Sequence, residues 1–369
     1  MMALTMAFVG ETIPKAKTGS AMGLLGTMSA IGTALGPSLG GVLIAGLGWP
    51  AIFFINVPLG ILTLVLAHRF LPVDCQKLKS QKLKTARAGF DPVGTLLLAL
   101  TLAAYALAMT TGRGSFGLLN LTLLFTAVFG AGLFALAESK AASPLIRMAM
   151  FRNPALGAGF AMSTLVTTVV MATLVVGPFY LSGALALDAA IVGLVMSSGP
   201  IVAALTGVPA GRLVDRFGVH RMTIAGLIAM AAGSFILPIM PTRFGIPGYI
   251  APLVVITAGY ALFQAANNTA VMTNIRADQR GVISGMLNLS RNLGLITGAS
   301  VMGAVFALGS ATTDSMTTRP EAVAAGMRIT FAVAAVLIVV ALAIASVSHA
   351  LSRRAVAPGS EQGDGRRDG

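Results

Sequence analysis

The side chains of this sequence that could do chemistry are few, and they stand inside long apolar stretches. Arg291 lies in the stretch 283–309, roughly 15 Å from Gly281 if the stretch is read as a helix, and Ser284, Asn288 and Asn292 share its face at helical spacing. A charge at that depth in a membrane is costly, so we expect Arg291 to point into a cavity or towards a partner on another helix. A structural bond between helices and a side chain that extends to the interface remain open alternatives.

The preceding stretch, 249–271, carries a second polar face. Its members are Tyr260, Gln264, Asn267 and Asn268. Polar side chains inside a membrane usually face a cavity or one another, because contact with lipid is unfavourable for them. We therefore predict a substrate pathway lined by these four residues together with Asn288, Arg291 and Asn292.

Acidic side chains are placed differently from these polar groups. None of the 12 acids lies deep in an apolar stretch, and those that flank the stretches are Glu11, Asp91, Glu138, Asp188, Asp215 and Asp278. Proton coupling normally uses an acid within the membrane whose charge changes during the cycle, so these stretches offer no evident carrier.

The histidines and the single cysteine do not suggest an enzyme either. The 3 histidines are scattered along the chain: His68, His220 and His349. They have neither the spacing of metal ligands nor a partner that could act as a nucleophile. The sequence therefore predicts no enzyme active site, no metal site and no bound cofactor.

The composition shows what must position the polar residues. The chain of 369 residues is 56% hydrophobic and only 10% charged, with a mean hydropathy of +0.87, whereas a soluble domain has roughly 25% charged residues. The apolar residues form blocks close to the ~20 residues that cross a hydrocarbon core. We predict an all-α integral membrane protein with an apolar remnant at 1–10 and ten spans, at 18–45, 51–69, 93–111, 117–138, 156–183, 189–210, 221–240, 249–271, 283–309 and 323–348.

The formal charge of +13 lies mainly in the short connections between these spans. Most lysines and arginines fall on one side, while the connections on the other side carry only Arg113, Arg243 and Arg319. By the positive-inside rule the basic side, together with the C-terminus, is cytoplasmic. We therefore expect a multi-pass protein of the plasma membrane whose basic residues meet membrane lipids, with no nucleic acid as a partner.

Glycines recur at every fourth residue in the first span. Gly32, Gly36 and Gly40 would form one stripe without side chains, and Pro37 would bend the helix beside it. In lipid, close approach of backbones through small residues is a main source of helix association. A general packing face explains Gly-xxx-Gly by itself. The full pattern, Gly-xxx-Gly-Pro-xx-Gly-Gly ending at Gly41, resembles the glycine-proline motif in the fifth helix of antiporters of the major facilitator superfamily.

Two further stretches resemble the same superfamily. Residues 48–60 are similar to the turn between the fifth and sixth helices of its fourteen-helix drug:proton antiporters, with Trp49 at the interface and Asn56 and Pro58 in the next helix. Residues 211–221 are similar to the loop Gly-x-Leu-x-Asp-Arg-x-Gly-x-x-Arg between the second and third helices of one half. The residues that match this gating loop are Gly211, Asp215, Arg216, Gly218 and Arg221.

Within the gating loop each residue has an expected role. Asp215 would accept hydrogen bonds from backbone amides at the start of the next helix. Arg216 and Arg221 would pair with it or with a neighbouring helix, and Gly218 would allow a tight reversal. A capped basic turn explains any one of these residues, but the whole spacing favours the gating loop.

The resemblance implies that the chain has five parts. They are the remainder of an N-terminal helical half in 1–69, a basic cytoplasmic linker in 70–92, an extra two-helix hairpin in 93–138, a C-terminal six-helix half in 139–350 and a disordered cytoplasmic tail in 351–369. The first helices of the family pattern, three or four of them, have no counterpart in this sequence.

The function implied by the resemblance is secondary active transport, with multidrug efflux by proton antiport across a bacterial cytoplasmic membrane. Its partners would be an amphipathic small molecule, protons as the coupling ion and membrane lipids. Export of a dedicated metabolite, and a truncated membrane fragment that does not transport, are the alternatives. Because the family places a proton carrier in the helices that are lacking, we expect this chain to insert into a membrane without driving proton-coupled efflux alone.

Overall fold

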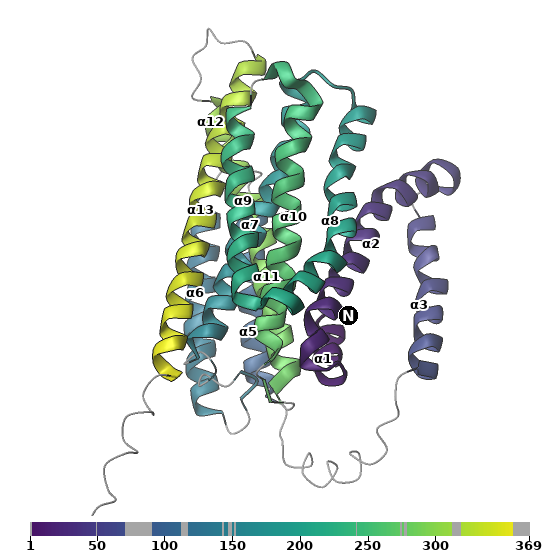
Figure 1. Cartoon of the computed structure of the whole chain (residues 1–369). Helices are drawn as coiled ribbons and strands as arrows, with labels where there is room; N and C mark the ends of the chain where they lie inside the picture. Colours follow the sequence, from purple (N-terminus) through teal and green to yellow (C-terminus); the bar gives the residue numbers. More distant parts are fainter. Residues whose placement is uncertain are drawn as a thin grey trace, which may run out of the picture.

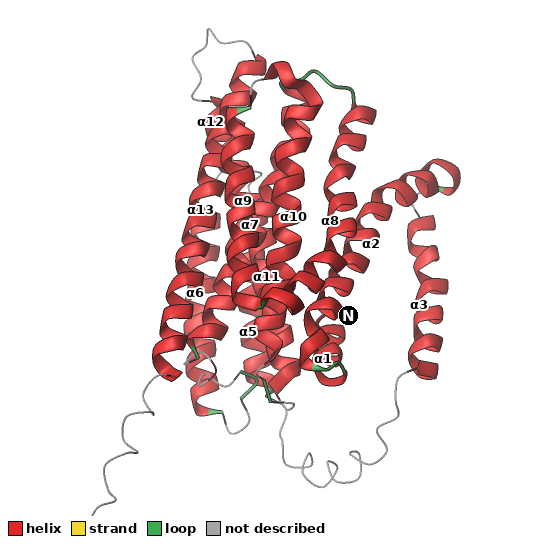
Figure 2. Ribbon diagram, viewed as in Figure 1, coloured by secondary structure: helices red, strands yellow, loops and turns green. Residues whose placement is uncertain are grey.

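A computed structural model shows a bundle of long helices (Figure 1). The structure describes residues 2–48, 50–70, 91–111, 117–141, 144–146, 150, 153–240, 242–273, 275–276, 279–311 and 319–356. Figure 2 shows helices and loops but no strand in this part of the chain. The predicted all-α architecture is confirmed, while most of the predicted linker and tail lies outside the described residues.

The helices follow the order of the predicted spans. Their bounds are Met2–Thr12 for α1, Thr18–Leu47 for α2, Ala51–Phe70 for α3, Pro92–Thr110 for α5, Leu118–Lys140 for α6, Pro154–Gly183 for α7, Ala189–Phe217 for α8, Val219–Ile239 for α9, Gly245–Thr273 for α10, Arg280–Thr297 for α11, Gly303–Ala311 for α12 and Arg319–Val356 for α13. A 3₁₀ turn, η3 (Thr242–Phe244), precedes α10.

Within the described residues, nine helical segments are long and apolar enough to cross a membrane. They correspond to nine of the ten predicted spans, and the tenth forms the 30-residue helix α2. The predicted span 283–309 is not one regular helix, because a π-helical turn at Gly298–Met302 joins α11 to α12. At Gly298 a Cβ would lie 2.7 Å from the carbonyl oxygen of Thr168, so this turn presses directly against α7.

The core of the bundle lies between α7, α9, α10 and α13. Its large buried side chains include Leu227, Tyr249 and Phe331. Where α9 meets α10, a Cβ on Gly226 would lie only 2.8 Å from the carbonyl oxygen of Gly259, so the two backbones are in contact. Association through small residues is typical of helices in lipid. These four helices form the frame against which the others are placed.

Two of the histidines meet at one end of this frame. The rings of His220 in α9 and His349 in α13 stack with their centroids 3.5 Å apart and their planes 11° apart. In the sequence they are separated by more than a hundred residues and look unrelated. Helix packing therefore brings together side chains that the sequence shows only as scattered.

Two parts of the molecule lie outside the core. Helices α5 and α6 pack on each other, and the hydroxyl of Tyr105 in α5 shares a hydrogen bond with the hydroxyl of Thr297 in α11. Helix α3 stands apart from the bundle in Figure 1, and its large side chains, Phe53 and Leu64 among them, are exposed. In a membrane, lipid tails or other helices would cover such apolar faces.

Candidate functional site

The beginning of α2 crosses the end of α8 at very close range. A Cβ built on Gly23 would lie 2.3 Å from the carbonyl oxygen of Gly207, and one built on Gly211 would lie 2.3 Å from the carbonyl oxygen of Gly19. Real Cβ atoms essentially never approach another atom more closely than 3.0 Å, so only glycine fits at these positions. The two backbones are therefore in direct contact, as small residues permit in lipid.

The carboxylate of Asp215, in the last turn of α8, binds the start of α2 at this crossing. It accepts hydrogen bonds from the backbone amides of Gly19 and Ser20, both at 2.8 Å, and from the hydroxyl of Ser20. The first amides of a helix lack partners within that helix, and they carry its positive end. The crossing thus combines backbone contact with a charged cap.

The prediction that Asp215 caps the next helix along the chain is wrong. Helix α8 continues to Phe217, so the side chain of Asp215 projects sideways from the helix towards α2. The N-cap of α9 is Gly218, which has φ 89° and alone separates α8 from α9. A reversal with positive φ is one that glycine adopts at little cost.

The basic residues of the gating loop do not bind the carboxylate. The guanidinium of Arg216 lies 5.3 Å from the centre of the Phe217 ring, and Arg221 is exposed. Within the described residues, Asp215 is bound by α2 and by neither arginine. Its partners therefore come from a distant part of the chain and not from its own loop.

The predicted glycine stripe lies farther along α2 than this crossing. Gly32 is exposed, and no described atom lies within 4 Å of a Cβ built on it. The surroundings of the other residues of the predicted motif are not described. These residues are Gly36, Pro37, Gly40 and Gly41. Gly32 is not a packing residue in this structure, because α2 diverges from α8 along its length (Figure 1) and the glycines of α8 face Gly19 and Gly23.

A cavity adjoins the crossing and is lined by α2, α7, α8, α10 and α11. Its empty volume is about 1120 Å³, including the space that opens to solvent. Most of the wall is apolar, with Val170, Leu174, Met196, Leu253 and Ile256 as its larger side chains.

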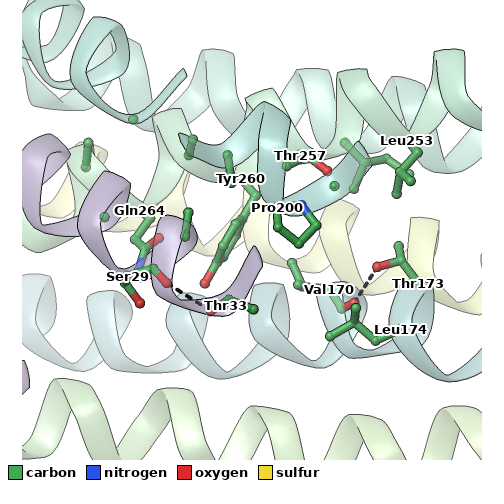
Figure 3. A pocket seen from close by; sticks show the side chains of 18 of the residues that line it. Ser29, Thr33, Val170, Thr173, Leu174, Pro200, Leu253, Thr257, Tyr260 and Gln264 are labelled. Carbon is green, nitrogen blue, oxygen red and sulfur yellow. Dashed lines mark hydrogen bonds between the residues drawn. The ribbon is translucent and has the colours of Figure 1, made fainter. Parts of the chain in front are cut away.

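The amide side chain of the cavity wall lies towards one end of the cavity. In Figure 3, Gln264 and Ser29 lie towards this end, and Leu253 and Leu174 lie towards the other, where Thr173 and Thr257 add single hydroxyl groups. On α10 alone, about 16 Å of helix separate Leu253 from Gln264. The end that holds Gln264 is therefore the more polar of the two.

At the polar end, two residues of α10 bind Arg291 of α11. Its Nη2 atom donates to the hydroxyl of Tyr260 at 3.3 Å. The amide oxygen of Gln264, turned towards the guanidinium, accepts from Nη1 at 2.8 Å and from Nη2 at 2.9 Å. All three residues line the cavity. The arrangement combines two of the predicted alternatives for Arg291, a place at a cavity and a bond between helices.

The other four predicted pathway residues are not found on the described cavity wall. Asn267 is buried and donates to the carbonyl oxygen of Gly159 in α7 at 3.1 Å, and Asn268 is also buried. Asn292 is exposed and donates to the backbone carbonyl of Asn288 at 2.8 Å. A helix turns by about 100° per residue, so Asn292 points away from the side of Arg291. At the level of Asn267, the same face of α10 meets α7 and not the cavity.

Several residues of the cavity wall were not predicted from the sequence, because each carries only a single hydroxyl group in an apolar helix. They are Ser29, Thr33, Thr173 and Thr257. Two of them donate to carbonyls of their own helices, Thr33 to Ser29 at 2.9 Å and Thr173 to Val170 at 2.7 Å (Figure 3). Such hydroxyls are common in membrane helices, and only the spacing of Ser29 and Thr33 could have indicated a shared face.

Comparison with known proteins identifies relatives along most of the chain. A family model described as Major Facilitator Superfamily matches residues 1–299 and again residues 160–366. The uncharacterized transporter YebQ of Escherichia coli (strain K12) is 28% identical over 302 residues, which cover 82% of this chain and 65% of YebQ.

Two further relatives have names that state a function. The multidrug resistance protein Stp of Mycobacterium tuberculosis (strain ATCC 25618 / H37Rv) is 28% identical over 306 residues, covering 82% of this chain and 55% of Stp. The riboflavin transporter RibZ of Clostridioides difficile (strain 630) is 28% identical over 307 residues, covering 83% of this chain and 65% of RibZ. The match thus covers between 55% and 65% of the length of these relatives. Because the family model covers most of the residues printed here, this chain belongs to the Major Facilitator Superfamily.

Proposed function

We propose that this chain acts in the export of amphipathic small molecules across a bacterial cytoplasmic membrane, in exchange for protons. The cavity between α2, α7, α8, α10 and α11, with its largely apolar wall, carries the proposal. An apolar wall with a few polar groups at one end suits compounds that share an apolar body and differ in detail. The name of Stp, a multidrug resistance protein, supports a broad range of substrates.

The crossing of α2 and α8 is the proposed gate at the cytoplasmic end. Lys15, Lys17 and Arg212 lie beside it, and such basic residues mark the cytoplasmic side of membrane proteins. With the crossing closed, the cavity is reached from the outside. Access from the cytoplasm requires α2 to separate from α8, which breaks the hydrogen bonds of Asp215 to Gly19 and Ser20. Forming and breaking them would bias the equilibrium between the two states.

This gate makes a prediction about turnover. Asp215→Asn keeps an acceptor but removes the charge that favours the closed crossing. We expect slower alternation between inward-facing and outward-facing states, with less effect on substrate affinity. The measurement is turnover and apparent affinity in the same efflux assay. An unchanged turnover with a large loss of affinity would instead place Asp215 in substrate binding.

The coupling proton is the second part of the proposal. No Asp or Glu lines the cavity among the described residues. Intramembrane proton carriers are usually acids that face a cavity or a partner. We therefore expect the coupling acid to lie outside this cavity wall.

Export of one dedicated metabolite is the alternative function. The name of RibZ, a riboflavin transporter, favours it, since RibZ is as similar to this chain as Stp is. The two functions differ in the number of compounds exported, and one assay separates them.

The test is dye efflux from bacterial cells that lack their major pumps and carry the gene that encodes this chain. Cells are loaded with a cationic, a neutral or an anionic amphipathic dye, or with riboflavin, and loss is followed with and without a protonophore. We expect efflux of several dyes that the protonophore stops. Efflux of riboflavin alone would favour the dedicated exporter, and no efflux of any compound contradicts the proposal.

A further inference from the structure

The charged group on the cavity wall can select ligands by their charge. Among the described lining residues, Arg291 is the only one with a formal charge, and there is no Asp or Glu. A guanidinium stays protonated at any physiological pH. Electrostatic interactions are stronger in a largely apolar cavity than in water. At the end of the cavity where it lies, the guanidinium therefore attracts an anion and repels a cation.

The contacts of Arg291 with α10 indicate where an anionic group would bind. With the amide oxygen of Gln264 turned towards the guanidinium, this one oxygen accepts from Nη1 at 2.8 Å and from Nη2 at 2.9 Å, whereas a carboxylate could offer one oxygen to each of these nitrogens. The hydroxyl of Tyr260 accepts from Nη2 at 3.3 Å and keeps its own proton to donate. An anion at this point would take the place of the amide oxygen of Gln264. It would accept hydrogen bonds from the guanidinium of Arg291 and from the hydroxyl of Tyr260.

The remainder of the wall fits an apolar body attached to such a group. Leu174, Leu253 and Ile256 line the cavity, and in Figure 3 the first two lie away from the end that holds Gln264. About 16 Å of α10 separate Leu253 from Gln264, which is enough for a fused aromatic ring system on a short chain.

We propose that the cavity binds amphipathic anions, with a carboxylate or sulfonate at Arg291 and Gln264 and an apolar body against α7, α8 and α10. This proposal rests on the proposed function and names the class of its substrates. Cationic amphiphiles bind less well, because the described residues at the polar end offer them a positive charge and no carboxylate.

The test measures binding to the 369-residue chain in nanodiscs of neutral lipid. Three probes share a pyrene body on a four-carbon chain and differ in the end group: pyrenebutanoate, pyrenebutanol and pyrenebutyltrimethylammonium. Empty nanodiscs supply the correction for partition into lipid. We expect the carboxylate to bind about tenfold more tightly than the alcohol, and the ammonium to bind most weakly.

Variants connect this preference to the guanidinium. Arg291→Gln is expected to remove the preference for the carboxylate, while Arg291→Lys keeps most of it because the charge remains. Gln264→Glu places a carboxylate in the fork and should remove the preference even if Arg291→Gln fails to fold. The matched control is Arg243→Gln, which removes an exposed arginine of η3 that does not line this cavity. Melting temperatures without ligand show that each variant is folded.

Two results would overturn the proposal: equal binding of carboxylate and ammonium by the unmodified chain, and a carboxylate preference that survives in both Arg291→Gln and Gln264→Glu. The dye assay in cells separates this failure from failure of the proposed function. Efflux without charge preference removes only the inference about anions. Absence of probe binding together with absence of efflux contradicts both.

Discussion

The beginning and the middle of α2 both contain glycines, yet they have opposite surroundings. At the beginning of the helix, Gly19 and Gly23 touch the backbone of α8. Farther along, Gly32 has no described atom within 4 Å of the position of a Cβ. The difference lies in the partner, because α8 presents Gly207 and Gly211 at the level of the first pair. In this part of α2, the glycines pack closely where the neighbouring helix also offers glycine.

The largest effect is expected from a branched side chain in the crossing. In Gly23→Val, the new Cβ would lie 2.3 Å from the carbonyl oxygen of Gly207, so α2 and α8 must separate. We expect a loss of about 3 kcal/mol in the free energy of unfolding, measured by denaturant titration in micelles. Gly32→Val is the matched control and should have almost no effect. Equal losses in the two variants would break the comparison between the beginning and the middle of α2.

A smaller change on α8 tests the same contact from the other side. In Gly207→Ala, the added Cβ would lie 2.3 Å from Oγ1 of Thr27 and 3.0 Å from the carbonyl oxygen of Gly23. We expect a loss of about 1–2 kcal/mol, since the strain exceeds what alanine contributes to helix stability. Gly199→Ala, on the same helix with nothing within 4 Å of its Cβ, should instead stabilise by about 0.5 kcal/mol. Destabilisation by Gly199→Ala would show that α8 tolerates no side chain anywhere on this face.

The charged cap is expected to contribute somewhat less than the backbone contact. Asp215→Asn weakens the hydrogen bonds to Gly19 and Ser20 and should cost about 1–2 kcal/mol, read from the same titration. The control is Asp188→Asn at the other end of α8, where the side chain is exposed and makes no capping hydrogen bond. If both substitutions cost the same, net charge and not the cap explains the loss.

The smallest effect concerns the asparagines, which show the same contrast between packed and open positions. Asn267→Ala removes the bond to the carbonyl oxygen of Gly159 and should cost about 1 kcal/mol. Asn292→Ala removes a bond within its own helix at an exposed position, and its effect should stay within about 0.5 kcal/mol. A larger loss at Asn292 than at Asn267 would indicate that another helix covers Asn292 in the membrane.

A considerable part of this molecule could be predicted from the sequence. The apolar spans were placed correctly because crossing a membrane requires about 20 apolar residues in a row, and that requirement is local. The reversal at Gly218 is also local, since one residue with φ 89° separates two helices. Arg291 was expected at a cavity because a charge at that depth is costly in lipid.

Other features could not be predicted because they depend on how each helix is rotated and paired. Asp215 could cap α9 or any helix that begins near it, and the contact with Gly19 joins residues 196 positions apart. Likewise, Asn267 and Gln264 share a polar face in the sequence, but one meets α7 and the other the cavity.

The sequence by itself determined the class of the protein, the number and order of its spans, and the absence of acids from their middles. These follow from composition and from the thickness of a membrane, which act on each segment separately. Only the tertiary structure decided which glycines pack, which helix Asp215 caps and which polar residues face the cavity. Those features depend on contacts between helices far apart in the chain, because in lipid apolar burial alone does not determine which faces meet.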